Sequence, residues 1–292
     1  MTARNRSHPL VDAAWLKKHL HQQAVRVVDV RWHLQGVDGR EAYARGHVPG
    51  AVFVDLDGEL SAPHGPGRHP LPSPEQLAEA MQAAGIDDDT QVIAYDDAGG
   101  SIAARLWFLL ELYGHAGQVR VLDGGLDAWT AAGGALTPEV PTLSRGAWTP
   151  GPMRRQIVDA HAVERLRHKR GVVLLDARAA ERYRGDTEPV DARAGHIPGA
   201  RNAPWSENLS DGKFKSPAEL RARYRALGAG PTAEVVAYCG SGVTACHDLL
   251  ALELAGFPAR RLHLYEGSWS DWSRDPFRPA AVGAPARRAR RR

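Results

Sequence analysis

Six short apolar runs rich in β-branched residues indicate an α/β protein. They read VRVVDV, QVIAYD, VRVLDG, GVVLLDA, EVVAYC and RLHLY, and each is bounded by Gly, Asp or Pro. Apolar runs of this length are typical of strands buried on both faces of a parallel sheet. Between them lie helical patterns at 73–85 and 216–228, each with Ser-Pro at its start and Gly at its end. Strands that alternate with helices predict mostly parallel sheets with helices on both faces.

The same order of segments occurs twice along the chain. ARGHVPGAVFVD (44–55) matches ARAGHIPGARNAP (192–204), and QVIAYDDAGG (91–100) matches EVVAYCGSG (234–242). Two further pairs match in the same way: VRVVDVR with GVVLLDAR, and VRVLDGGLDAW with RLHLYEGSWSDW. Matching blocks in one order indicate a duplicated domain joined by a linker rich in Pro, Gly, Ser and Thr. The predicted boundaries are a first domain at 1–140, a linker at 141–153, a second domain at 154–280 and a basic tail at 281–292.

Composition and charge indicate which kinds of binding partner can be excluded. Hydrophobic residues make up 43% of the 292 residues and charged residues 24%, which is an ordinary globular composition. Five arginines within residues 287–292 account for more than the whole net charge of +3, so the rest of the chain is slightly acidic. We therefore expect neither nucleic acid nor membrane as a partner, and a solvated, disordered tail. No apolar stretch approaches the ~20 residues of a membrane helix. With two cysteines and no apolar signal segment, a disulfide framework is excluded and a cytoplasmic location is expected.

One turn carries a candidate nucleophile. After EVVAY the second repeat reads Cys239-Gly240-Ser241-Gly242-Val243-Thr244, whereas the first repeat reads Asp96-Asp97-Ala98-Gly99-Gly100-Ser101. Backbone N–H groups and a helix N-terminus converge at such a strand-to-helix turn, and they favour the thiolate of Cys239. The alternative is a small buried cysteine that only packs, which is the interpretation we give to Cys246. The first repeat is predicted to be silent, with Asp96 and Asp97 dispensable for catalysis.

The surroundings of Cys239 exclude several kinds of cysteine chemistry. A Cys-x5-Arg phosphatase needs arginine at the position of Ala245, and no motif supplies the His and Asn of a papain-like hydrolase. CxxC is absent and no ligand cluster is evident, so neither a metal nor an organic cofactor is expected. A thiolate among N–H groups is suited to accept a sulfur atom, because the same groups stabilise the charge of a persulfide.

Together these motifs resemble the tandem-domain sulfurtransferases of the rhodanese superfamily, from about Asp12 to Pro279. The segments that carry the resemblance are GHVPGA, GHIPGA, CGSGVTAC and YEGSWSDW. It implies two rhodanese-like domains, of which the second is catalytic. It also implies a cysteine persulfide that passes sulfur to cyanide or to a thiol, including that of a thioredoxin-like protein. The remaining alternative is a persulfide relay protein that delivers sulfur to a protein partner.

The composition of the cysteine turn bears on the sulfur donor. Members that prefer thiosulfate resemble Cys-Arg-Lys-Gly-Val-Thr, whereas the turn here resembles that of 3-mercaptopyruvate sulfurtransferases, and thiosulfate remains the alternative donor. In the latter enzymes a serine two positions after the cysteine, here Ser241, is proposed to form a relay with a histidine and an aspartate. His69 and Asp57 match those positions, unless both are ordinary residues of a surface loop.

The arginines before GHIPG are candidates for holding the carboxylate of mercaptopyruvate, which a guanidinium binds with two parallel hydrogen bonds. The first arginine of the family pattern maps onto Arg182. The second falls on Val190, so Arg184 or Arg193 is a candidate replacement, unless these are solvated surface residues. The predicted donor-binding set is completed by the turn residues Gly240, Gly242, Val243 and Thr244.

Overall fold

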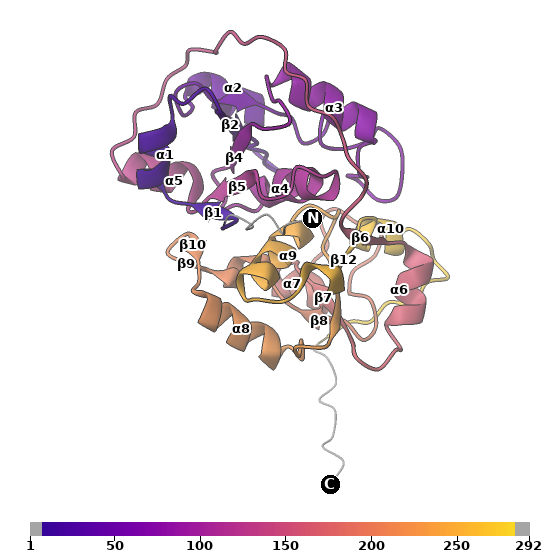
Figure 1. The fold of residues 1–292 in the computed structure, drawn as a ribbon. Helices are drawn as coiled ribbons and strands as arrows, with labels where there is room; N and C mark the ends of the chain where they lie inside the picture. The colour runs from indigo at the N-terminus through magenta and orange to yellow at the C-terminus, as the bar shows by residue number, and fades with distance from the viewer. Residues whose placement is uncertain (1–7, 284–292) are drawn as a thin grey trace. The chain divides into compact units, whose positions relative to one another are not determined.

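The computed structural model describes residues 8–283, which form two compact units (Figure 1). The first unit holds the residues up to Gly65, His69–Arg155 and Asn208–Ser216, and the second holds Pro66–Arg68, Gln156–Glu207 and the residues from Pro217 onward. Each repeat therefore contributes one short segment to the unit of the other. Within the predicted tail, Ala281 forms an isolated bridge with His196, and residues 284–292 lie outside the described residues.

A five-stranded parallel sheet with the order β1-β5-β4-β2-β3 forms the centre of the first unit. Its strands are β1 (Leu10–Val11), β2 (Val25–Asp29), β3 (Val52–Phe53), β4 (Gln91–Tyr95) and β5 (Val119–Leu122). Its helices are α1 (Ala13–His19), α2 (Gly39–Arg45), α3 (Pro74–Ala83), α4 (Ala103–Leu112) and α5 (Gly125–Ala131). The antiparallel hairpin of β9 (Leu209–Ser210) and β10 (Lys213–Phe214) also belongs to this unit.

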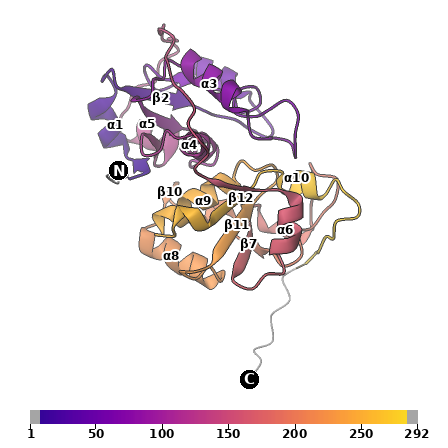
Figure 2. The same ribbon diagram turned by 45° about the vertical axis from the view of Figure 1, so that its right-hand side comes forward.

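The second unit repeats this topology, with the strand order β6-β12-β11-β7-β8. Its strands are β6 (Gln156–Val158), β7 (Val172–Asp176), β8 (Arg201–Asn202), β11 (Glu234–Tyr238) and β12 (Leu262–Tyr265). Its helices are α6 (Ala160–Leu166), α7 (Ala180–Arg184), α8 (Pro217–Ala226), α9 (Ala245–Leu254) and α10 (Ser268–Trp272), with short 3-10 turns at Trp205–Asn208 and Ala259–Arg261. In Figure 2, α8 and α9 lie on one side of this sheet and α6 and α10 on the other. The predicted fold class, two α/β domains with parallel sheets, is confirmed.

The two cores follow from the period-2 alternation of strand residues. In the first unit Val27, Ile93 and Tyr95 pack with α1 and α5. In the second unit Leu174, Val236 and Tyr238 pack with α6, α7 and α10. The GHVPGA and GHIPGA motifs support these cores, because His47 stacks on Tyr43 and His196 on Tyr183, with ring centroids 3.8 Å and 3.7 Å apart. These motifs are therefore structural elements of each unit.

Local signals also position the helices as the sequence predicts. The helix predicted at 73–85 is α3, where the Ser73 side chain accepts a hydrogen bond from Gln76 N at 3.1 Å and Pro74 occupies the first turn. The helix predicted at 216–228 is α8. Throughout residues 8–283, no helix combines the length and the apolar character that crossing a membrane requires.

Candidate active site

Cys239 is the first residue after β11, at the carboxyl end of the second sheet. Residues 239–244 connect β11 to α9, and the Cys239 Sγ accepts a hydrogen bond from Gly242 N at 3.1 Å. Gly242 has φ +82, and a Cβ there would lie 2.4 Å from Glu266 O, so only glycine allows this turn. The cysteine is 2% exposed. The fold thus holds the thiol against a backbone N–H group at the edge of the sheet where α/β proteins bind ligands.

Ser268, the first residue of α10, bonds the backbone of the cysteine. Its Oγ accepts from Cys239 N at 3.1 Å and donates to Tyr265 O at 2.9 Å. Ser268 has φ +53, in the left-handed region that a residue with a side chain seldom adopts. At the matching position of the first repeat, Gly125 has φ +55. Serine therefore adopts a glycine-like conformation at the position where its hydroxyl group contacts Cys239 N.

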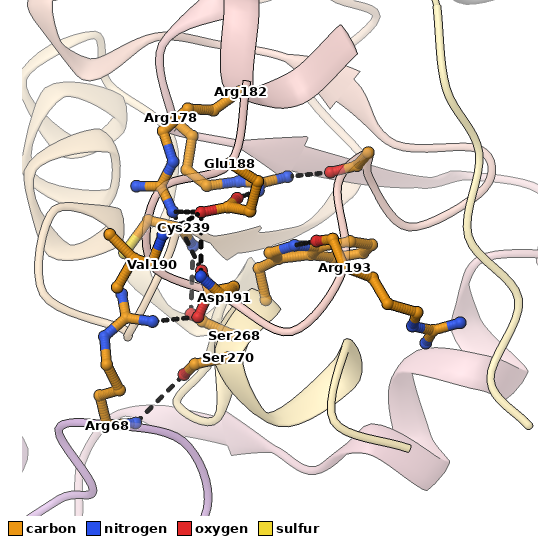
Figure 3. A network of polar contacts seen from close by, with 12 residues as sticks. Arg68, Arg178, Arg182, Glu188, Val190, Asp191, Arg193, Cys239, Ser268 and Ser270 are labelled. Carbon is orange, nitrogen blue, oxygen red and sulfur yellow. Dashed lines mark hydrogen bonds and ion pairs between the residues drawn. The ribbon is translucent and has the colours of Figure 1, made fainter. Parts of the chain in front are cut away.

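A chain of alternating arginines and carboxylates lies beside the cysteine (Figure 3). At its inner end Arg178 bonds Asp176 through Nη2 at 2.7 Å and Glu188 through Nη1 at 3.2 Å. Arg182 Nη2 then donates to Glu188 at 2.6 Å and to Asp191 at 3.0 Å. The other oxygen of Asp191 accepts from Arg68 Nη1, which closes the chain on a residue of the first repeat.

Burial and hydrogen bonding act in opposite directions on the two carboxylates of this chain. Burial raises the pKa of Glu188, but hydrogen bonds from Arg182 and from the backbone of Asp191 and Val190 bring it below its usual value. For Asp191, burial dominates and raises the pKa, although Arg68 and Arg182 both favour its charged form. The Asp191 side chain is 2% exposed, so it serves as an internal spacer between two guanidinium groups.

Two guanidinium groups lie over the residue that follows the cysteine. A Cβ built on Gly240 would lie 2.9 Å from Arg68 Nη2 and 3.5 Å from Arg182 Nη1. Glycine at 240 therefore leaves room for both cations beside Cys239. Of the predicted donor-binding residues, the structure brings Arg182, Gly240 and Gly242 together with the cysteine. Val243 and Thr244 complete the same turn, where Val243 O accepts from Cys246 N at 3.0 Å.

The structure does not bring Arg184 or Arg193 to Cys239. Arg193 donates to the carbonyl oxygens of Ser273, Asp275 and Arg278 at 2.9, 2.8 and 3.0 Å. Figure 3 shows its side chain directed away from the cysteine. Arg184 pairs with Asp186 at 2.7 Å and its side chain is 42% exposed. Arg193 thus fastens the chain after α10, and Arg184 lies in solvent.

The predicted relay pair forms in the first unit. His69 Nε2 and Asp57 Oδ1 are 2.9 Å apart, and Trp32 Nε1 donates to the other Asp57 oxygen at 2.8 Å. The His69 side chain is nearly buried, whereas that of Asp57 is 60% exposed. Ser241 is buried in the cysteine turn of the second unit. The relay that would link it to His69 stays a prediction.

Sequence reasoning missed Arg68, Ser268 and Arg178. For Arg178 a signal was present, because VRVVDVR and GVVLLDAR both carry Asp-x-Arg, and Arg31 pairs with Asp29 as Arg178 pairs with Asp176. For Ser268 the signal was the exchange of glycine for serine between LDGGLDAW and YEGSWSDW. Arg68 has no counterpart in the repeat and no local pattern, so only its position in space reveals it.

Comparison with known proteins identifies the family of both repeats. The rhodanese-like domain matches residues 12–132 and again residues 159–275. A probable 3-mercaptopyruvate sulfurtransferase of Pseudomonas aeruginosa is 48% identical, over 95% of this chain and 99% of its own length. A putative thiosulfate sulfurtransferase of Mycobacterium tuberculosis is 45% identical, over 89% of this chain and 91% of its own length.

A solved structure shares the fold over nearly the whole chain. The crystal structure of SseA from Escherichia coli, described as a 3-mercaptopyruvate sulfotransferase, is 33% identical and aligns with a TM-score of 0.81, over 90% of this chain and 100% of that one. Both repeats match the same domain, and the relatives align from end to end. The chain belongs to the rhodanese-like family, as a sulfurtransferase with two tandem domains.

Proposed function

We propose that this protein transfers sulfane sulfur from 3-mercaptopyruvate to a thiol or to cyanide through a persulfide on Cys239. The observation that carries the proposal is the position of the thiol, against Gly242 N–H with the guanidinium groups of Arg68 and Arg182 over Gly240. The relative from Pseudomonas aeruginosa, named for this donor, supports the assignment.

In the first half of the cycle the Cys239 thiolate attacks the sulfur atom of the donor. A sulfur–sulfur bond forms, the carbon–sulfur bond of mercaptopyruvate breaks, and its electron pair passes to carbon as the enolate of pyruvate. The proton of the donor thiol balances the step by converting the enolate to pyruvate. Gly242 N–H is placed to stabilise the negative charge on the sulfur of Cys239.

In the second half an acceptor thiolate or cyanide attacks the outer sulfur of the persulfide. The sulfur–sulfur bond breaks and its electron pair returns to Cys239 as thiolate, so the cycle is redox-neutral and closes without a metal or an organic cofactor. Ser268 keeps the cysteine backbone in place through both halves, because its Oγ holds Cys239 N.

Thiosulfate is the second candidate donor. The relative from Mycobacterium tuberculosis is named for it, and two guanidinium groups suit a sulfonate as well as a carboxylate. Delivery of the persulfide to a protein thiol, such as that of a thioredoxin-like protein, is the alternative for the acceptor.

Mass spectrometry and steady-state rates test the proposal together. After incubation with 3-mercaptopyruvate, we expect one added sulfur atom on the peptide that contains both cysteines, and fragment ions that assign it to Cys239 and not to Cys246. Rates with both donors then give the preference, and a higher kcat/KM for thiosulfate would reverse the donor assignment. Absence of added sulfur with either donor would refute the persulfide route. Stoichiometric loading without turnover on cyanide or small thiols would favour a relay.

A further inference from the structure

We propose that Arg68, a residue of the N-terminal repeat, binds the acid group of the sulfur donor. It forms with Arg182 a two-guanidinium site over Gly240. This inference rests on the proposed function, because it specifies how the donor is held beside Cys239. The position that the family pattern predicts for a second arginine holds Val190, and neither Arg184 nor Arg193 replaces it.

The backbone around Arg68 is anchored in the second unit. Residues Pro66–Arg68 belong to that unit, and Arg68 N donates to Ser270 Oγ at 3.1 Å. Gly67 has φ +76, and a Cβ there would lie 2.5 Å from Gly267 O, so the segment approaches the loop before α10 closely. Ser270 N in turn bonds Gly240 O at 2.9 Å. Arg68 is thus fixed to α10, the helix that also bonds the cysteine turn.

One carboxylate sets the spacing of the two arginines. Asp191 receives Arg68 Nη1 on one oxygen and Arg182 Nη2 on the other. Each arginine therefore turns a different edge of its guanidinium group toward Gly240, namely Nη2 of Arg68 and Nη1 of Arg182. Asp191 is a positioning residue, since it holds the two cations and lies away from the edges that face the cysteine turn.

The edges that face Gly240 indicate where an anion binds. Within the part of the chain that the structure describes, Arg182 bonds Glu188 and Asp191 through Nη2, which leaves the N–H groups of Nη1 beside Gly240 for a ligand. Arg68 Nη2 lies against Gly240, and its side chain is 27% exposed, which leaves it reachable from solvent. A carboxylate has two oxygens and can accept from both arginines at once.

A substitution at Val190 can test whether Arg68 binds the donor or only stabilises the structure. It lines a cavity of about 370 Å³ together with Arg68, Asp191 and Ser270. An arginine placed at 190 therefore has space to present its guanidinium on the same side as Arg68. If Arg68 acts by binding the donor, a second cation from position 190 restores its function, whereas a purely structural contact between Arg68 and Asp191 is not restored in this way.

The experiment compares R68A, R68K and the double variant R68A/V190R with the parent enzyme, using 3-mercaptopyruvate as donor and cyanide as acceptor. For R68A we expect KM for the donor to rise roughly ten-fold to a hundred-fold, since a charge-assisted hydrogen bond is lost, with kcat and the KM for cyanide nearly unchanged. Inhibition by pyruvate, which keeps the carboxylate of the donor, weakens by a similar factor. R68K recovers part of the loss and R68A/V190R recovers most of it.

Arg184→Ala is the matched control, because it removes the same charge from a solvent-exposed side chain on the helix that carries Arg182. An unchanged donor KM in R68A would overturn the inference. A purely structural role of Arg68 would also overturn it. In that case R68A would have a lower melting temperature, its KM for cyanide would change as well, and V190R would not restore activity. Failure of the proposed function itself is separate, since the parent enzyme would then add no sulfur to Cys239 with either donor.

Discussion

The two repeats place different groups at the same turn. In the second unit the turn after β11 begins with Cys239, whose Sγ accepts from Gly242 N at 3.1 Å. In the first unit the turn after β4 begins with Asp96. Its Oδ1 accepts from Ala98 N and Gly100 N at 2.9 and 2.8 Å, and its Oδ2 accepts from Ile102 N and Ala103 N, both at 2.8 Å. The turn after β4 thus surrounds a carboxylate with four backbone N–H groups at the N-terminus of α4, whereas after β11 Gly242 N contacts the thiol sulfur.

This difference in the turns leaves the shared architecture of the two units unchanged. The supports below the turns are alike: Tyr95 OH bonds Val48 N at 3.2 Å, Tyr238 OH bonds Ile197 N at 3.1 Å, and each unit has a buried Asp-x-Arg ion pair. The turns differ in the residue at their first position, which is Asp96 in one unit and Cys239 in the other. In the second unit Glu188 and Asp191 also extend the ion pair outward to Arg182 and Arg68.

Replacement of Cys239, the residue that distinguishes the two turns, is expected to have the largest effect. Cys239→Ser removes the only side chain in the turn that can carry sulfur, so we expect transfer to fall roughly a thousand-fold or more. Cys246→Ser is the control, because that buried thiol donates to Gly242 O at 3.4 Å from within α9, and this variant should keep most of the activity. Rates with 3-mercaptopyruvate and cyanide measure both variants. Substantial transfer by Cys239→Ser would place the nucleophile elsewhere.

Removal of the Asp96 carboxylate tests how much this group stabilises the first unit. Asp96→Ala leaves four buried N–H groups without their acceptor, so we expect the first unit to lose about 3 kcal/mol or more of stability. Asp97→Ala is the matched control, since Asp97 makes a partly exposed pair with His33 at 3.1 Å that contributes about 0–1 kcal/mol. Thermal and denaturant unfolding measure the two variants. Equal melting temperatures would mean that the Asp96 carboxylate is not needed in the cradle.

Much of the fold and the position of the cysteine can be predicted from the sequence, because they depend on local sequence patterns. Apolar runs, Ser-Pro helix starts and repeated blocks predict the fold and the duplication, and the cysteine is predicted from its place after a strand. The sequence also predicts Asp96 and Asp97 to be equally dispensable for catalysis, because it cannot show that Asp96 is wholly buried among N–H groups while Asp97 faces solvent.

The arginines illustrate what sequence reasoning could not reach. Proximity along the chain favoured Arg193 and Arg184, but the former is turned toward carbonyl oxygens after α10. Arg68 meets Asp191 and Ser270, which lie 123 and 202 residues further along. A contact of that span leaves no periodic or local pattern, so it is visible only after folding.

A smaller effect is expected at position 268, which corresponds to Gly125 of the first repeat. Two variants there distinguish the loss of a hydrogen bond from the relief of backbone strain. Ser268→Ala loses the hydrogen bond to Cys239 N, which is worth about 0.5–1.5 kcal/mol, so we expect kcat/KM to fall roughly three-fold to ten-fold. Ser268→Gly loses the same bond but relieves the left-handed backbone, and should be more stable than Ser268→Ala by about 1 kcal/mol. Parallel melting curves and rates decide the matter. If alanine proves as stable as glycine there, the strain argument fails.

The smallest effect concerns acid stability of the first unit. His115 Nδ1 accepts from Trp148 Nε1 at 3.1 Å and Nε2 donates to Thr90 O at 2.7 Å, so the ring is neutral. Burial lowers the pKa of His115. The unfolded state therefore binds more protons, and stability contributed by His115 is lost as pH falls through its ordinary value near 6.5.

The second repeat has Phe257 at the matching position, which suggests the test variant. His115→Phe should show a shallower loss of melting temperature between pH 7 and pH 5 than the parent, because the titrating ring is gone. Identical slopes for the two proteins would remove His115 from the acid response.

The reciprocal exchange of segments limits how this protein can be divided. Residues 66–68 are part of the second unit and residues 208–216 part of the first, although the chain passes between the units at Arg155–Gln156. A protease nick or a gene split at the linker would give fragments that match the repeats of the sequence but not the units of the structure. The fragment with Cys239 would lack Arg68, and the other would lack the β9–β10 hairpin. Neither fragment would therefore contain every segment of its own structural unit.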